Sequence, residues 1–245
     1  MSLLAFEHVT KRRLDGRREL MVLKDVCFEV DAGDFIGLWG MRRSGKSTLL
    51  RIAAGLESPD DGRVVFDGQD LTVLSGDARA EVLRARGVGL ATADWRPSVS
   101  QEVIEYVATA LLPALMSLRQ GREVAREQLE RMGVLNCAHM RTDRLSIGEA
   151  MRVSLAQALA REPRLLLVDE PAALPGPTER HELYDLLTSL GKSSGLAVLV
   201  ASEDVGIVKR ARRRMTIGSG VLRSMDKEGE VVSFPVGRAA DGQSG

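Results

Sequence analysis

Residues 40–47 read GMRRSGKS, and this short segment constrains the fold more than any other part of the 245-residue chain. It satisfies the pattern G-x-x-x-x-G-K-[ST], which needs a strand before it and a helix after it. Residues 35–39 form an apolar run without alternation, typical of a strand that is buried on both faces. Downstream, apolar residues recur at helical spacing at Leu49, Leu50, Ala53 and Leu56. The segment therefore predicts a strand, a phosphate-binding loop and a helix in succession.

The chemistry expected of this loop follows from its backbone and from two side chains. Backbone N–H groups and the helix N-terminus would hold phosphate oxygens. Lys46 would reach the outer phosphates of a nucleoside triphosphate, and the Ser47 hydroxyl would bind Mg²⁺. The alternative is a chance match on a glycine-rich turn, and the flanking strand and helix argue against it. The residues expected to contact nucleotide are Gly40, Met41, Arg42, Arg43, Ser44, Gly45, Lys46, Ser47 and Thr48.

A second motif places two acids at the end of an apolar run. Residues 165–170 read LLLVDE, a pattern that predicts a buried strand with its acids at the carboxyl end, where ligands gather in open α/β sheets. Asp169 would hold Mg²⁺ through water, and Glu170 would polarise the attacking water as general base. A strand that simply ends in exposed acids is the common alternative for one such motif. The two motifs together are poorly explained by coincidence, and they leave kinases, helicases and GTPases open.

Predicted strands and helices alternate along the rest of the chain, which favours an α/β fold with a mainly parallel, covered sheet. Residues 93–161 are mostly helical in pattern and are interpreted as an inserted helical subdomain. The apolar pattern thins after Asp226, as expected of a frayed tail. The other predicted elements are strands at 26–30, 63–66 and 196–201 and a helix at 178–191.

Composition narrows the possible partners. Lys plus Arg and Asp plus Glu are equal at 34 each, so no global positive field attracts nucleic acid, and no nucleic-acid partner is expected. The basic run at 209–214 is interpreted as a helix C-terminus. The apolar stretch at 107–116 contains Pro113 and falls short of the roughly 20 residues that cross a bilayer, so another subunit would supply any membrane span. Cys27 and Cys137 lack metal-ligand spacing and are expected to be reduced core side chains.

The residues just before the acidic strand narrow the class of nucleotide protein. Residues 145–149 read LSIGE and are followed by AMRVSLAQALAREPRLLLVDEP. This stretch resembles the signature segment of the ATP-binding cassette (ABC) ATPases, whose usual form is LSGGQ before a helix and the acidic strand. The resemblance extends from about Leu4 to Leu222. Within it, residues 71–86 look most like the ATPases of lipoprotein-releasing and macrolide-export systems.

The resemblance implies a P-loop NTPase fold of ABC type, with N-terminal antiparallel strands beside the mainly parallel core. Residues 1–225 would then form a single nucleotide-binding domain, followed by a tail at 226–245. Residues 1–92 and 162–225 would be its ATP-binding core, and residues 93–161 its helical subdomain.

The resemblance also implies a head-to-tail dimer with two composite sites. Each ATP would lie with Mg²⁺ between the loop of one protomer and the signature helix of the other, at Ser146, Gly148 and Glu149. Nucleotide binding would close the dimer, and the helical subdomain would couple that motion to transmembrane permease subunits. The chain is then expected in the cytoplasm, held at the inner face of the cell membrane through those subunits.

Three departures from the family pattern affect the expected hydrolysis. Ala93 stands where the family usually carries a Gln, with Asp94 as a partial substitute. Nearby Gln101 is expected to form a helix-capping box with Ser98 instead. Residues 172–175 replace the usual aspartate-containing segment after Glu170.

The family's switch His, expected just after the strand at 196–201, is replaced by Ser202, with Glu203 and Asp204 after it. None of His8, His139 and His181 follows that strand, so surface or packing roles are expected for them. Losing one positioned acid–base group costs about 10² to 10⁴ in rate, so an ATPase with retained MgATP binding and slow turnover is expected.

Further departures concern nucleotide contacts. The aromatic residue that stacks on adenine is missing, and Arg13 is the nearest substitute because a guanidinium plane can stack on a base. Arg43 stands where the family usually has Gly, which places a Cβ where the loop often has none. Glu149 stands in place of a Gln, and Ile147 in place of a Gly. Glu149 could pair with Arg42 or Arg43 across the dimer; two exposed, unpaired charges are the equal alternative.

Two classes of function therefore remain open. The first is an energy-coupling subunit of a membrane transporter, as a homodimer or as a heterodimer with a second, complete ABC ATPase. The second is a hydrolysis-poor regulatory module that signals through nucleotide binding and dimer closure. Family members that act on ribosomes or DNA are a third reading, but the tandem cassettes or long coiled-coil insertions usual there are missing from this sequence.

Overall fold

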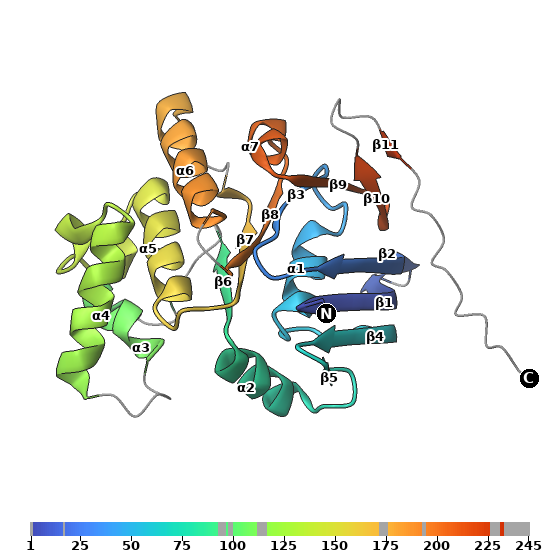
Figure 1. Ribbon diagram of the computed structural model, residues 1–245, viewed down its shortest axis with the longest axis horizontal. Coiled ribbons are helices and arrows are strands. Elements are labelled where there is room, and N and C mark those ends of the chain that lie inside the picture. The colour runs from blue at the N-terminus through green and yellow to red at the C-terminus, as the bar shows by residue number, and fades with distance from the viewer. Residues whose placement is uncertain are drawn as a thin grey trace, which may run out of the picture.

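A computed structural model describes residues 2–16, 18–92, 97, 100–111, 117–171, 176–192, 195–225 and 231–232. Two sheets and a group of helices make up the molecule (Figure 1). Helices α3, α4 and α5 gather at one end, the strands β1, β2 and β4 lie at the other, and a second sheet runs between them.

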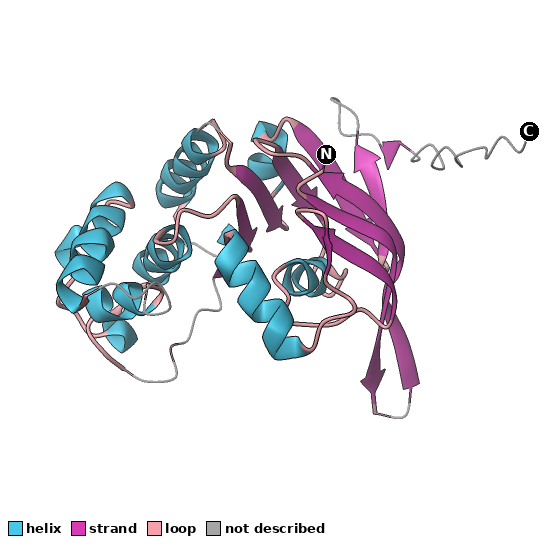
Figure 2. Ribbon diagram, turned by 60° about the horizontal axis from the view of Figure 1, so that its bottom comes forward, coloured by secondary structure: helices cyan, strands magenta, loops and turns pink. Residues whose placement is uncertain are grey.

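The N-terminal sheet is antiparallel and has the order β2-β1-β4-β5. Its strands are β1 (Leu4–Asp15), β2 (Arg18–Val30), β4 (Asp61–Phe66) and β5 (Gln69–Asp70). Figure 2 shows the β1–β2 hairpin extending beyond the rest of the protein. The predicted strand at 26–30 is therefore the end of a much longer strand, and the N-terminal antiparallel strands implied by the family resemblance are confirmed.

The central sheet has the order β11-β10-β9-β3-β8-β7-β6. Five adjacent strands run parallel: β3 (Phe35–Trp39), β6 (Val88–Thr92), β7 (Leu165–Asp169), β8 (Ala197–Ser202) and β9 (Arg213–Gly218). At one end β10 (Val221–Met225) and β11 (Val231–Val232) are antiparallel. The mainly parallel sheet is confirmed. In the predicted tail, residues 226–230 and 233–245 lie outside the described residues, and β11 lies between them.

Seven α-helices are present in the described parts of the chain. Helices α3, α4 and α5 fall inside the segment predicted to be helical, and α1 follows the glycine-rich loop as expected. Helix α2 was not predicted, because its sequence is mostly polar. Their bounds are α1 (Lys46–Ala53), α2 (Gly76–Arg86), α3 (Val103–Thr109), α4 (Leu118–Arg131), α5 (Ile147–Leu159), α6 (Pro177–Leu190) and α7 (Val205–Arg210), with short 3₁₀ turns η2 (Leu135–Cys137) and η3 (Thr142–Arg144).

The central strands are covered on both faces, which explains their unbroken apolar sequences. Alternate residues face two different hydrophobic cores. The core beside the N-terminal sheet and α1 includes Ile36, Leu38, Leu165, Leu167 and Leu199. The core beside α5 and α6 includes Leu166, Val168, Val198, Val200, Leu155 and Leu187.

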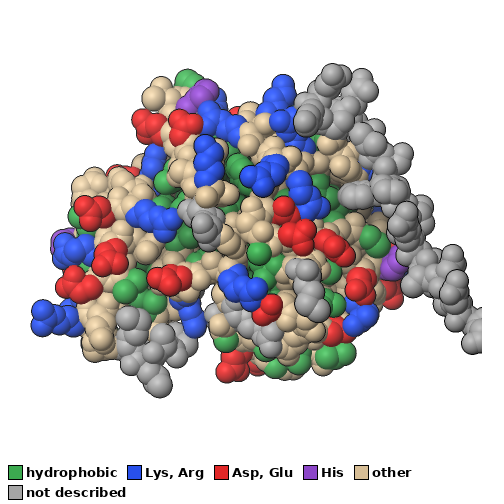
Figure 3. Space-filling view, in the orientation of Figure 1, with side chains coloured by type: hydrophobic (Ala, Val, Ile, Leu, Met, Phe, Trp, Pro, Cys, Tyr) green, Lys and Arg blue, Asp and Glu red, His purple; other side chains and the backbone are tan. Residues whose placement is uncertain are grey.

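The surface is mixed in charge. On the face drawn in Figure 3, basic and acidic side chains are interspersed over both the helical end and the sheet end. Lys209 and Arg210 end α7 as expected, whereas Arg213 and Arg214 begin β9, so only part of the basic run is a helix C-terminus. None of the described helices is both long and apolar enough to span a bilayer.

Two sequence expectations about packing are wrong. Cys137 is fully buried, but Cys27 is exposed on β2. Gln101 does not cap α3, because that helix begins at Val103 after its N-cap residue Glu102. The backbone N–H of Gln101 instead donates to the Thr142 hydroxyl at 3.3 Å. Ser98 lies outside the described residues.

Replacing Leu167 by Ala should destabilise the protein by about 2–5 kcal/mol, because this fully buried strand residue would leave a cavity between sheet and α1. Leu118→Ala is the matched control, since Leu118 is 68% exposed and should change the free energy of unfolding by about 0.5 kcal/mol or less. Urea denaturation followed by circular dichroism measures both. Equal losses for the two variants would contradict the assigned core.

Candidate functional site

Three loops converge at the carboxyl edge of the central sheet. The glycine-rich loop follows β3, Glu170 follows β7, and Glu203 follows β8. Strand register places Trp39 opposite Ser202 and Asp169 opposite Ala201, so the three strands end at the same level. This is the edge at which α/β sheets bind ligands.

Two glycines allow the loop to adopt its tight path. A Cβ on Gly40 would lie 2.6 Å from the carbonyl oxygen of Ile217. Gly45 has a φ of 112°, and a Cβ there would lie 2.6 Å from the carbonyl oxygen of Val22. Arg43 also has a positive φ, of 61°, at the position where the resembled family usually has Gly. The backbone therefore keeps the glycine-type conformation even with an arginine in place.

Lys46 is the cation at the centre of the site, and its side chain is only 5% exposed. Its Nζ donates to the carbonyl oxygens of Gly40 at 2.6 Å and Met41 at 3.1 Å. It also forms an ion pair with Glu170 Oε1 at 2.9 Å, and Glu203 Oε1 lies 3.8 Å away. One ammonium group is therefore held by two carbonyls and faces two carboxylates.

Glu170 is fixed by the strand next to it. Its backbone N–H donates to the Ala201 carbonyl at 2.9 Å, and its Oε2 accepts a hydrogen bond from the Glu203 backbone N–H at 3.1 Å. Its φ is 50°, a strained value for a residue other than glycine. Backbone strain of this kind is often found at functional sites, where the surrounding contacts enforce it.

The residue after β8 that faces this site is Glu203. Ser202, the residue predicted to replace the switch His, is the last residue of β8 and is fully buried. Its hydroxyl accepts a hydrogen bond from the Asp204 backbone at 3.0 Å. The strand was predicted to end at Ala201; because it runs one residue further, the first side chain beyond it belongs to Glu203. The Glu203 carbonyl also accepts from Trp39 Nε1 at 3.0 Å.

The residues at this edge fit a triphosphate with its cation. Helix α1, every residue of which is described, has no acidic residue in its first turn and no side-chain cap, so its N-terminal amides can face an anion. The Ser44 hydroxyl is buried and has no hydrogen-bond partner among the described residues. Ser47 is exposed, Thr48 is buried, and Asp169 ends β7 half-buried.

Arg13, the candidate for stacking on a base, lies on β1 and is held by an acid that sequence reasoning did not consider. Its guanidinium donates to Glu57 Oε2 at 2.8 Å, in the loop after α1. Arg51 and Lys11 lie 3.4 Å and 3.9 Å from the same carboxylate. Half of the Arg13 side chain is exposed, so one part of it is accessible to a ligand.

The signature segment forms the N-terminus of α5, apart from the Lys46 cluster. Ser146 is the N-cap residue and Glu149 completes a capping box: the Ser146 backbone N–H donates to Glu149 Oε2 at 2.8 Å, and the Glu149 backbone N–H donates to the Ser146 hydroxyl at 3.3 Å. A hollow of about 460 Å³ at this helix end is lined by residues that include Gly148. The sequence already contained the S-x-x-E spacing that predicts a capping box.

Glu149 also contacts a buried thiol. Cys137 Sγ donates to Glu149 Oε1 at 3.3 Å. Burial, together with this carboxylate, raises the pKa of Cys137 to about 11. The pKa of Glu149 lies below its ordinary 4.5 because the carboxylate accepts from the Ser146 backbone N–H. Pairing of Glu149 with Arg42 or Arg43 across a dimer remains a prediction, and within one chain Glu149 already has partners. The family departures at Ala93, Asp94 and 172–175 lie outside the described residues.

Replacing Glu149 by Ala should destabilise the isolated chain by about 0.5–2 kcal/mol at pH 7, because one half of the capping box is lost. Glu149→Gln should lose less stability than Glu149→Ala, since Gln supplies the same acceptor without the charge. Because the folded state lowers the Glu149 pKa, the carboxylate's contribution is present above pH 4.5 and is lost as the pH falls through the folded-state value. Urea denaturation at pH 7 and pH 3.5 measures this; a loss for Gln equal to that for Ala would exclude capping.

Comparison with known proteins agrees with this geometry. A family model described as ABC transporter matches residues 23–173. The dimeric structure of MJ0796, a bacterial ABC transporter cassette, is 26% identical, with a TM-score of 0.81, and the match covers 89% of this chain and 95% of that one. MJ0796 in a post-hydrolysis state with ADP and Pi is 25% identical, with a TM-score of 0.82, covering 93% and 100%.

A third solved structure shares the fold. It is cbiO1 from Clostridium perfringens, part of the ABC transporter complex cbiONQ, with 24% identity and a TM-score of 0.74 over 90% of this chain and 86% of that one. These relatives do not test the expected likeness to lipoprotein-releasing and macrolide-export ATPases, which stays a prediction. The family match spans more than half of the chain and includes both the glycine-rich loop and the acidic strand. The chain therefore belongs to the ABC transporter family and has the ABC ATPase cassette fold.

Proposed function

We propose that this protein is the ATP-binding subunit of an ABC transporter, that it binds MgATP and hydrolyses it slowly, and that it acts on transmembrane permease subunits. The observation that carries the proposal is the Lys46–Glu170 ion pair at 2.9 Å, which joins the phosphate-binding loop to the general-base candidate. The relatives support it, since MJ0796 has been solved as a dimer and with ADP and Pi. The protein would work in the cytoplasm at the inner face of the membrane, held there by the permease subunits.

The residues of the site have separate tasks in this proposal. The loop from Gly40 to Thr48 binds the phosphates, and Lys46 exchanges Glu170 for a phosphate oxygen when nucleotide enters. Glu170 is then free to accept a proton from the attacking water. Ser47 and Asp169 would hold Mg²⁺, which supplies positive charge against the phosphate oxygens and nearby carboxylates. Arg13 would lie against the base.

Composite sites in a dimer follow from the same proposal. Ser146, Gly148 and Glu149 of one protomer would face the nucleotide bound by its partner. The capping box orients Ser146 and leaves the N-terminal amides of α5 directed at that nucleotide. The chain would form a homodimer or pair with a second ABC ATPase.

Slow hydrolysis is proposed because of Glu203. Where the family has an imidazole that can donate to phosphate, this chain has a carboxylate 3.8 Å from Lys46. A carboxylate repels phosphate oxygens and cannot donate a hydrogen bond at neutral pH. The same residue supports the second candidate function, a regulatory module in which nucleotide binding and dimer closure matter more than turnover.

Isothermal titration with MgATP tests nucleotide binding directly. Wild type should bind, and Lys46→Ala should bind about 10- to 100-fold more weakly, since hydrogen bonds to charged groups contribute about 1.5–3 kcal/mol. Lys192→Ala, an exposed lysine after α6, should leave the affinity unchanged. A folded wild-type protein without affinity for MgATP would refute the proposal.

Steady-state ATPase measurements test the role of Glu203. Glu203→His should raise turnover by about 10²-fold, the lower end of what one positioned acid–base group supplies. Glu203→Gln removes the negative charge without adding an imidazole, so it should recover less. Turnover of Glu203→His at or below that of Glu203→Gln would show that the carboxylate does not limit hydrolysis.

Purification from the native membrane separates the two candidate functions. A transporter subunit should co-purify with a permease, and its ATPase rate should rise in the complex. Recovery of a second, complete cassette would identify a heterodimer. A homodimer with negligible turnover in the presence and absence of the membrane protein would instead favour the regulatory module.

A further inference from the structure

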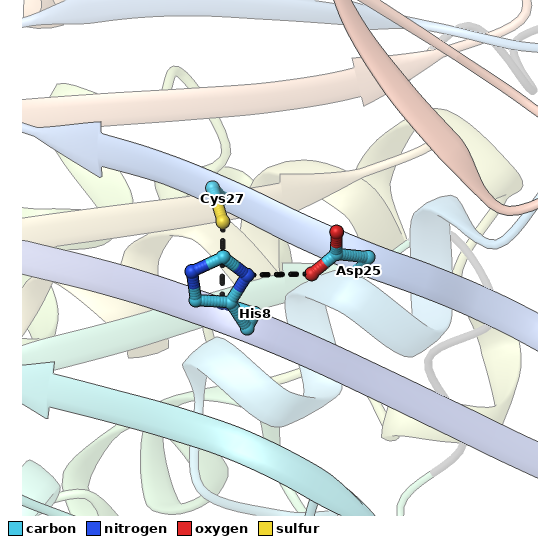
Figure 4. A group of neighbouring side chains, drawn as sticks. All are labelled: His8, Asp25 and Cys27. Carbon is cyan, nitrogen blue, oxygen red and sulfur yellow. Dashed lines mark hydrogen bonds and ion pairs between the residues drawn. The ribbon is translucent and has the colours of Figure 1, made fainter. Parts of the chain in front are cut away.

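Cys27 is exposed, although free cysteine is among the most often buried residue types. It lies on the outward face of β2, between the core residues Val26 and Phe28. His8 and Asp25, both exposed, lie beside it on the same face of the β1–β2 pair (Figure 4). None of these three residues is assigned to nucleotide binding. The assigned residue nearest to them along the chain is Arg13, which lies further along β1.

Two bulges bring these three side chains together. Phe6 pairs with Phe28 and Val9 with Val26, so two residues of β1, one of them His8, oppose Cys27 alone. On β2 there is also an extra residue. Two residues, one of them Asp25, lie between the partners of Val9 and Lys11, where β1 has a single residue. An extra residue in a strand redirects the side chain that it carries. Asp25 and Cys27, two residues apart on β2, share a face by ordinary alternation. Without the bulge in β1, His8 would not share that face with them.

The backbone at both bulges is in the left-handed region, with φ of 53° at His8 and 49° at Asp25. Residues other than glycine adopt this region uncommonly, and such strain tends to persist where function requires it. Among the described residues, Arg43 and Glu170 of the nucleotide site share this property, and so do Asp67, Glu162 and Ser219. The left-handed backbone therefore accompanies the two bulges and does not by itself identify a site.

The contacts in the cluster fit metal ligands rather than packing. His8 Nδ1 lies 2.7 Å from Asp25 Oδ1, and the His8 backbone N–H donates to Cys27 Sγ at 3.2 Å. The candidate ligand atoms of the three residues all lie within 4.8 Å of one another. With bond lengths of about 2.0–2.3 Å, the ligands of a tetrahedral zinc ion are roughly 3.3–3.7 Å apart. Small rotations of exposed side chains span that difference.

We infer that His8, Asp25 and Cys27 form a binding site for a divalent cation of the zinc class, with water in the fourth position. A nitrogen, a carboxylate oxygen and a thiolate sulfur together favour Zn²⁺ over Mg²⁺ or Ca²⁺, which take oxygen ligands. Cation binding releases the thiol proton, and the thiolate and carboxylate charges then balance the ion. The site is separate from the Mg²⁺ that the nucleotide carries.

The ion would fasten β1 to β2 at both bulges. The same stretch of β2 lies against the nucleotide loop, because the Val22 carbonyl oxygen closely approaches Gly45. The Lys24 backbone N–H also donates to the Gly220 carbonyl at 2.9 Å, and the Gly220 backbone N–H donates to the carbonyl of Ser44 in that loop at 3.3 Å. A cation that binds only the folded strands also stabilises the protein by mass action. Zinc should therefore raise the thermal unfolding temperature as well as bind.

Titration of untagged, reduced, nucleotide-free protein with Zn²⁺ tests the inference. Calorimetry should give one site per chain, and Co²⁺ in place of Zn²⁺ should give the absorption band of a cobalt–thiolate bond. Cys27→Ser and His8→Gln should each weaken Zn²⁺ binding at least about tenfold, the smallest loss usual even for outer-shell changes. Both should abolish the zinc-dependent rise in unfolding temperature.

Cys137→Ala is the matched control, because this other thiol is buried and donates a hydrogen bond to Glu149. It should keep both the zinc affinity and the cobalt band. Circular dichroism establishes that every variant is folded. Absence of Zn²⁺ binding by wild type, or an affinity unchanged in Cys27→Ser, would overturn the site. Either result leaves nucleotide binding at Lys46 untouched, so the two proposals fail independently.

Discussion

The ion pair between Lys46 and Glu170 is the interaction on which the proposed chemistry depends. It joins loops that follow two different strands, β3 and β7, with β8 between them in the sheet. A nearly buried ammonium group needs charged or polar partners, because desolvation of an unpaired charge costs several kcal/mol, on the order of the whole stability of a domain. Glu170 and two backbone carbonyls meet that need, and a bound triphosphate would meet it better.

The same cluster explains why binding and hydrolysis can separate. Binding relies on the loop backbone, the N-terminus of α1 and Lys46, all of which keep the geometry that phosphate requires. Hydrolysis relies in addition on groups that position water and donate to the departing phosphate. In the proposed function, Glu203 stands in place of the phosphate donor and carries the wrong charge for that role, whereas its backbone N–H donates to Glu170. The proposed function therefore predicts that the site retains its ligand and turns it over slowly.

Local patterns allowed much of this site to be predicted. We could predict the succession of β3, loop and α1, and also the acidic end of β7. Both are set by side-chain periodicity and glycine spacing, which involve only residues close together in sequence. The predictions were wrong where a shift of one residue changes which side chain faces the site or the core. β8 ends one residue later than predicted, which turns Glu203 rather than Ser202 toward Lys46. Cys27 was expected in the core, yet its alternation with Val26 and Phe28 already placed it on the outward face.

A structure of the protein with MgATP or a non-hydrolysable analogue would show whether the Lys46–Glu170 ion pair is replaced by nucleotide. We expect that Lys46 Nζ moves from Glu170 to a phosphate oxygen within hydrogen-bonding distance and that Glu170 faces the water beside the terminal phosphate. A bound nucleotide with the Lys46–Glu170 pair still intact and the phosphates away from the glycine-rich loop would contradict it.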